Sequence, residues 1–81
     1  MMKKRFMEII PPIIESEGLV FDSFEVGQKD GKKTLTITID KKDGKVDVDD
    51  CSRISRLIDP IIENEKFLDG SYLLIVSSPG T

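Results

Sequence analysis

The segment from Thr34 to Asp40 constrains the fold most, because apolar and polar residues alternate along it without a break. In an extended strand, Leu35, Ile37 and Ile39 point to one side and the threonines between them point to the other. This alternation is typical of an antiparallel sheet with one covered face and one face open to solvent. The chain therefore needs helices that cover a single face of a sheet.

Two segments have the spacing of helices that could provide this cover. The first spans about residues 2–17, and its apolar stripe consists of Phe6, Ile9, Ile10, Ile13 and Ile14. Pro11 and Pro12 lie inside it and remove backbone donors, so we expect a kink or a restart there. Gly18 is expected to cap the C-terminal end of this helix.

The second helix is predicted to start at Asp49 as its N-cap and to continue to about Glu65. We expect an interruption at Asp59-Pro60. Its buried stripe is expected to consist of Ile54, Leu57, Ile58, Ile61 and Ile62.

Two further strands complete the pattern. Leu19 to Gly27 predicts a strand with a bulge near Asp22 and Ser23, and Asp30-Gly31 predicts the turn of a hairpin. The last strand is expected over Ser71 to Ser77. A right-handed crossover through the second helix would most simply place this last strand beside the first one.

These elements predict an α+β fold, a two-layer αββαβ domain in which a three-stranded sheet carries two helices on one face. The length of 81 residues fits one domain, so residues 1–81 are interpreted as a single unit. The ending Ser77-Ser78-Pro79-Gly80-Thr81 contains breakers after a strand, as the start of a linker or a free terminus does.

The residue types that are missing exclude several classes of function. The chain has no histidine and one cysteine, so Ser-His or Cys-His catalysis and zinc sites built on histidine or clustered thiolates are excluded. Nothing in the sequence supplies a catalytic base, so we predict no enzyme activity, no metal site and no cofactor. A single cysteine, no long apolar run and no secretory signal predict a cytoplasmic protein without a membrane partner.

The formal net charge of −3 argues against tight sequence-independent binding to nucleic acid, so any RNA contact would be local. Two similar turns could supply contacts to RNA phosphates through Lys29, Lys32, Lys42 and Lys45. A strand between them separates the turns by roughly 20 Å. The alternative is that both are ordinary solvated turns.

The start of the second helix carries the other candidate residues. Asp47, Asp49 and Asp50 could attract a cation, but helix capping and the helix dipole explain them better. Cys51 could be activated in a first helical turn, although a packing role is favoured without a histidine partner. Arg53 shares a helix face with Arg56, which suits phosphate or carboxylate recognition or a plain exposed surface.

Three stretches in this order resemble one family. They are Ile9-Ile10-Pro11-Pro12-Ile13-Ile14-Glu15-Ser16-Glu17-Gly18, then Val46-Asp47-Val48-Asp49-Asp50-Cys51-Ser52-Arg53-Ile54-Ser55-Arg56, and finally Ser77-Ser78-Pro79-Gly80. Together they resemble the N-terminal domain of the ribosome maturation factor RimP.

The resemblance implies a cytoplasmic, non-enzymatic factor that assists assembly of the small (30S) ribosomal subunit. Its implied partners are the precursor subunit and a basic ribosomal protein, small-subunit protein number twelve. Contact with rRNA is expected from the lysine turns and not from the resemblance. It also implies that residues 77–81 begin a linker to a C-terminal barrel that this sequence does not include. The motif positions become the candidate contact residues: Asp49, Asp50, Arg53, Arg56, Ser77, Ser78, Pro79 and Gly80.

A stand-alone RNA-binding module of the KH-like class is the alternative, because the αβ layers and the lysine turns would suit it. KH domains clamp RNA with a Gly-x-x-Gly loop, and the glycines of this chain never have that spacing. The sequence therefore favours the assembly-factor interpretation.

Overall fold

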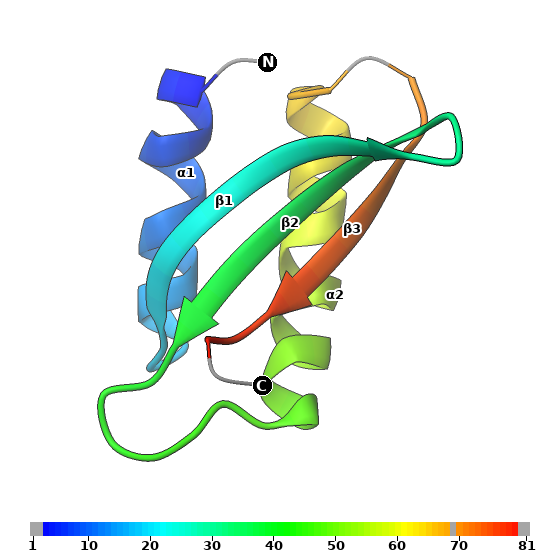
Figure 1. Ribbon diagram of the computed structural model, residues 1–81. Coiled ribbons are helices and arrows are strands. Elements are labelled where there is room, and N and C mark those ends of the chain that lie inside the picture. Colours follow the sequence, from blue (N-terminus) through cyan, green and yellow to red (C-terminus); the bar gives the residue numbers. More distant parts are fainter. Residues whose placement is uncertain (1–2, 69, 80–81) are drawn as a thin grey trace.

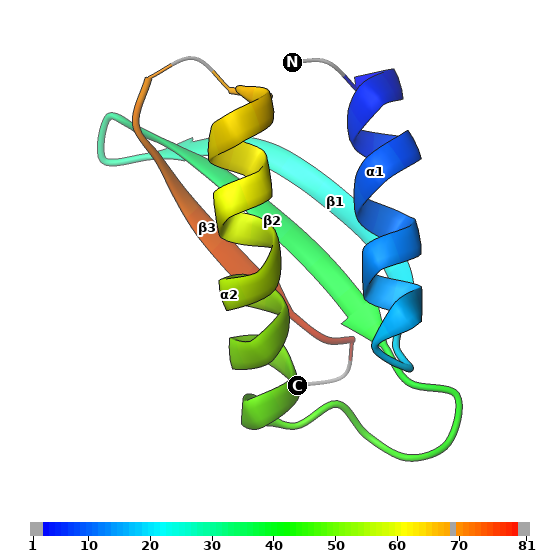
Figure 2. The ribbon, with the colours of Figure 1, turned by 180° about the vertical axis from the view of Figure 1, so that it is seen from behind.

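The computed structural model describes residues 3–68 and 70–79, and it confirms the predicted α+β class. The elements follow in the order α1 (Lys3–Ser16), β1 (Val20–Lys29), β2 (Lys32–Asp40), α2 (Val48–Glu65) and β3 (Tyr72–Ser77). Both helices lie on the same face of the three-stranded sheet, and the other face is uncovered (Figures 1 and 2). The two-layer arrangement is therefore the one that the alternating strand requires.

The sheet has the strand order β1-β2-β3, with β1 antiparallel and β3 parallel to β2. The prediction that the last strand lies beside the first was wrong. A short turn joins α1 to β1, so α1 covers the β1 side of the sheet and α2 covers the other side (Figure 2). Because β3 follows α2 in the chain, it pairs with the edge of β2 that β1 leaves free, on the side of the sheet that α2 covers.

The β1–β2 hairpin has the predicted bulge and the predicted turn. The pairing register shifts between Phe21 and Ser23, so Asp22 is the extra residue. Asp30 and Gly31 have φ angles of 52° and 78°, the left-handed pair of a type I′ turn.

Helix α1 ends at Ser16, and Gly18, with a φ of 80°, caps its C-terminal end as the sequence predicts. The Gly18 amide donates to the Glu15 carbonyl and the Leu19 amide donates to the Ile14 carbonyl, which together form a Schellman motif. Since Ile14 and Leu19 both belong to the core, this cap also directs the chain from α1 into β1.

The predicted restart at Pro11 and Pro12 is wrong, because α1 continues through both residues. Proline removes the amides that would have bonded to the carbonyls of Met7 and Glu8. Both of those residues are exposed, so water can bind their carbonyls. Helix α2 likewise continues through Pro60, and the carbonyl it leaves belongs to exposed Arg56.

Helix α2 is capped by Asp47, so the prediction of Asp49 as its N-cap was wrong. The Asp50 amide donates to Asp47 Oδ1 at 2.7 Å, and the Asp47 amide donates to Asp50 Oδ2 at 3.2 Å. These two carboxylates are the acceptors of a reciprocal capping box, and Asp49 lies inside the first turn of α2, which begins at Val48.

We predict that Asp47→Ala lowers the free energy of unfolding by about 1 kcal/mol, because it removes the side-chain acceptor of the capping box. Asp49→Ala is the matched control, since it removes only a first-turn charge and should cost about 0.3 kcal/mol. Urea denaturation measures the free energy of unfolding of both variants. A larger loss for the Asp49 variant would contradict the assignment of the cap.

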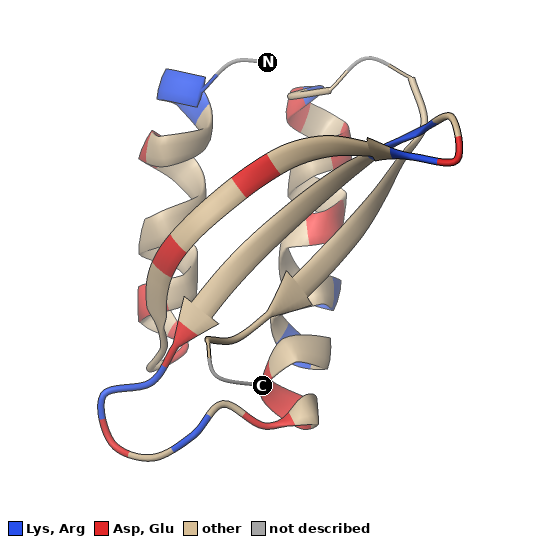
Figure 3. Cartoon of the chain, in the orientation of Figure 1, with Lys and Arg blue, Asp and Glu red and all other residues tan. Residues whose placement is uncertain are grey.

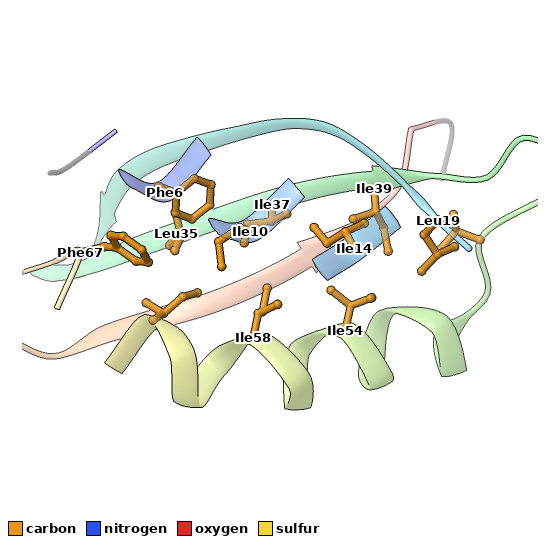
Figure 4. Close-up of a cluster of buried hydrophobic side chains, with 12 residues drawn as sticks. Phe6, Ile10, Ile14, Leu19, Leu35, Ile37, Ile39, Ile54, Ile58 and Phe67 are labelled. Carbon is orange, nitrogen blue, oxygen red and sulfur yellow. The ribbon is translucent and has the colours of Figure 1, made fainter. Parts of the chain in front are cut away.

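The core lies between the helices and the covered face of the sheet, as Figure 4 shows. Leu35, Ile37 and Ile39 are fully buried, as predicted. They meet Phe6, Ile10 and Ile14 of α1, Ile54, Ile58 and Ile62 of α2, and Leu19, Val46 and Phe67 from the connections. Leu57 was expected in the buried stripe but is 39% exposed, because it lies on the rim of α2.

Candidate partner-binding surface

The fold gathers most of the candidate residues at one end of the molecule. Strands β2 and β3 are parallel, so both finish at the end where α2 begins (Figure 1). We call this region, residues 41–56 and 77–79, the loop end. It contains the 41–47 connection, the first turns of α2 and the segment after β3.

The loop end is organised around the carboxylate of Asp50, a residue that is 5% exposed. It accepts hydrogen bonds from the Asp47 amide at 3.2 Å, Lys41 Nζ at 3.3 Å and an Arg53 guanidinium nitrogen at 3.2 Å. The bond from the Asp47 backbone is the main reason that the pKa of Asp50 is lowered, and Lys41 and Arg53 add to it. Asp50 therefore fixes the start of α2 as a buried anion with two cationic neighbours.

Arg53 connects this network to the other helix. Its Nε donates to Glu17 Oε1 at 3.1 Å, just beyond the end of α1. At the opposite end of the helix pair, Arg5 Nε donates to Glu65 Oε1 at 3.0 Å. Asp50 and Arg53 thus have structural partners, whereas Asp49 and Arg56 are exposed and have no ion pair among the described residues.

The lowered pKa of Asp50 predicts acid sensitivity. Its carboxylate stabilises the fold above its ordinary pKa of 3.8, and this contribution is lost as the pH falls through the lower pKa of the folded state. Asp50→Asn is expected to be less stable at neutral pH and to lose less stability below about pH 4. Thermal unfolding from pH 7 to pH 2 tests this, with Asp49→Asn as control. An unchanged acid dependence in the Asp50 variant would contradict the network.

Cys51 lies half-buried against the core, in agreement with a packing role. Burial raises the pKa of its thiol, and the negative charges of Asp50 and Asp47 raise it further. The structure therefore does not activate this cysteine. Among the described residues, no group of three or more histidine, cysteine or acidic side chains could hold a metal ion.

The four candidate lysines fall into two groups at opposite ends of β2 (Figure 3). Lys42 and Lys45 lie in the loop end, and Lys29 and Lys32 lie at the β1–β2 turn. All four are exposed, and within residues 3–68 and 70–79 none forms an ion pair. The fold therefore keeps the two turns apart, as the strand length predicts.

The segment after β3 supplies the remaining candidates. Ser77 and Ser78 are half-buried and Pro79 is exposed, while Gly80 lies outside the described residues.

A shallow hollow between the end of α1 and the start of β1 is lined by Glu15, Gly18, Leu19, Val20 and Lys42. Its rim carries one charge of each sign.

The family model described as the RimP N-terminal domain matches residues 9–81. The chain belongs to the RimP family. The match covers all three stretches that carry the resemblance, including the α2 start and the segment after β3. Membership in the RimP family implies a role in ribosome maturation. Neither α1 nor α2, the helices of the described residues, has the length and hydrophobicity of a membrane-spanning segment.

Sequence reasoning missed the capping box and two ion-pair partners of the α2 start, Lys41 and Glu17. The spacing Asp47-x-x-Asp50 is a signal that could have revealed the capping box. Lys41 and Glu17 have no such signal, because their contacts with α2 arise only when the 41–47 loop and the end of α1 meet in the fold.

Proposed function

We propose that this chain is a non-enzymatic assembly factor of the cytoplasm that binds the precursor of the small (30S) ribosomal subunit or one of its basic proteins. The observation that carries this proposal is the RimP family match over residues 9–81. In the same proposal, residues 77–81 begin a linker to a C-terminal barrel.

The loop end is the proposed contact surface. Arg56 and Asp49 are exposed there, and Asp50 and Arg53 hold the helix that presents them. Ser77, Ser78 and Pro79 lie at the same end of the molecule, because β3 finishes there. A net charge of −3 on the whole chain complements a basic ribosomal protein.

Contact with rRNA is a second part of the proposal, supported by Lys42, Lys45 and Arg56, which are exposed at the loop end and form no ion pair with any residue that the structure describes. Lys29 and Lys32 would make a separate phosphate contact at the opposite end. Phosphate contacts release counterions, so this part of the affinity should fall as salt rises.

Co-sedimentation with 30S precursors on sucrose gradients, at two salt concentrations, tests the proposal. We expect the chain, joined to its downstream natural sequence where there is one, to travel with immature subunits and less with mature ones. Absence from immature subunits at low salt would overturn the proposed function. Binding that is unaffected by salt would contradict the proposed phosphate contacts but not the proposed contact with a ribosomal protein.

A further inference from the structure

The outer edge of β3 is an uncovered strand. β3 forms one margin of the three-stranded sheet, and no described element pairs with its outer side (Figure 1). Edge strands present backbone N–H and C=O groups that can pair with another extended chain. On the uncovered face, the same strand exposes Leu73 by 51% and Ile75 by 37%. An added strand would therefore find both backbone partners and apolar side chains.

The two margins of this sheet differ in how well they are protected. β1 has a bulge at Asp22 and carries Glu25 and Lys29, features that discourage pairing at an edge. β3 pairs with β2 in an unbroken register, and its sequence Tyr-Leu-Leu-Ile-Val-Ser has no charge, proline or glycine. The edge that is open to pairing is therefore the one on β3.

Acidic groups lie beside the start of this edge. The Tyr72 hydroxyl donates to Asp59 Oδ1 at 2.8 Å. Burial raises the pKa of Tyr72, and the hydrogen bond to Asp59 and the charges of Asp59 and Glu63 raise it further. Both carboxylates are thus close enough to Tyr72, the first residue of β3, to interact with it, and Glu63 is exposed.

We propose that the outer edge of β3 binds an extended, basic peptide segment, which adds a fourth strand to the sheet. Apolar side chains of this segment would contact Leu73 and Ile75, and a lysine or arginine would lie near Asp59 and Glu63. That the segment comes from a ribosomal protein rests on the proposed function. A second copy of the chain is a poorer occupant, because each copy carries a net charge of −3 and the same carboxylates.

A synthetic peptide of alternating lysine and valine, nine residues long, is the probe, and alternating glutamate and valine is its control. Titration into the isotope-labelled chain, followed by NMR, should shift the amide signals of residues 72–77 and slow their hydrogen exchange. The glutamate peptide should cause neither change. Higher salt should weaken binding of the lysine peptide, because the attraction to Asp59 and Glu63 is screened.

Leu73→Lys should weaken binding of the lysine peptide about fivefold, because it removes an apolar contact with the valines of the peptide and adds a charge of the same sign as the peptide. Ser23→Lys is the matched control, since it adds the same charge to the same face on the far strand and should leave binding unchanged. Glu63→Gln should reduce the salt dependence. Because Leu73, Ser23 and Glu63 are exposed, all three variants are expected to keep the wild-type spectrum elsewhere.

Three results would overturn the inference: no shift at millimolar peptide, shifts confined to β1 or the loop end, or protection of residues 72–77 by dimer formation without peptide. The experiment contains no ribosomal component. A failure of peptide binding therefore does not contradict the proposed function, which co-sedimentation tests. A failure of co-sedimentation likewise does not decide whether the β3 edge binds a peptide.

Discussion

Ile37→Ala is expected to lower the free energy of unfolding by about 2–5 kcal/mol, because it leaves a cavity at the centre of the core. Ile37 is fully buried on the middle strand, between both helices and the sheet (Figure 4). A domain of this size has a total stability of about 4–12 kcal/mol, so the variant should be close to its unfolding transition at moderate temperature.

Thr36→Ala is the control for this prediction, because Thr36 directly precedes Ile37 on the same strand and faces the uncovered side. Thr36→Ala should lower the free energy of unfolding by about 1 kcal/mol or less. Guanidinium denaturation of both variants measures the difference. Similar losses for the two would contradict a sheet that is covered on one face only.

Arg56→Glu is expected to weaken binding to 30S precursors by roughly 30-fold, the effect of an interface arginine worth about 2 kcal/mol. Arg56 is exposed at the loop end and has no ion pair among the described residues, so the fold should not change. Quantitative co-sedimentation against a range of precursor concentrations measures the loss.

Lys4→Glu is the matched control, because it makes the same change of charge on an exposed residue at the opposite end of the molecule. It should bind precursors as the wild type does. Equal weakening by both variants would show that overall charge, not the loop end, governs binding, and would contradict the proposed surface.

The elements of the fold could be predicted from the sequence because their signals are local. Alternation in β2 fixes which side chains are buried, and Asp30-Gly31 fixes the hairpin turn. The proline positions misled the prediction, because an exposed carbonyl one turn earlier can bind water instead of an amide. Local spacing cannot report that solvation.

The position of β3 could not be predicted, because a crossover helix permits pairing at either free edge of the hairpin. Because α1 covers the β1 side of the sheet, α2 packs on the other side, and β3 pairs with β2 there. This arrangement depends on packing between segments that are distant in the sequence. The exposure of Leu57 has the same origin, since the helical stripe is wider than the surface that the sheet and α1 cover.

The candidate site was predicted in part. Sequence reasoning named the α2 start and the segment after β3, and the parallel strands explain why these lie at one end. It did not separate Asp50, which is enclosed by Lys41 and Arg53, from exposed Asp49. Residues adjacent in sequence on a helix face different surroundings, and only the packed loop decides which one is buried.

The most direct test of this account is hydrogen exchange of the chain, free and bound to immature 30S subunits. Exchange is expected to slow in residues 41–56 and 72–79, which cover the loop end and β3. Slowing confined to α1, with those two segments unchanged, would contradict it.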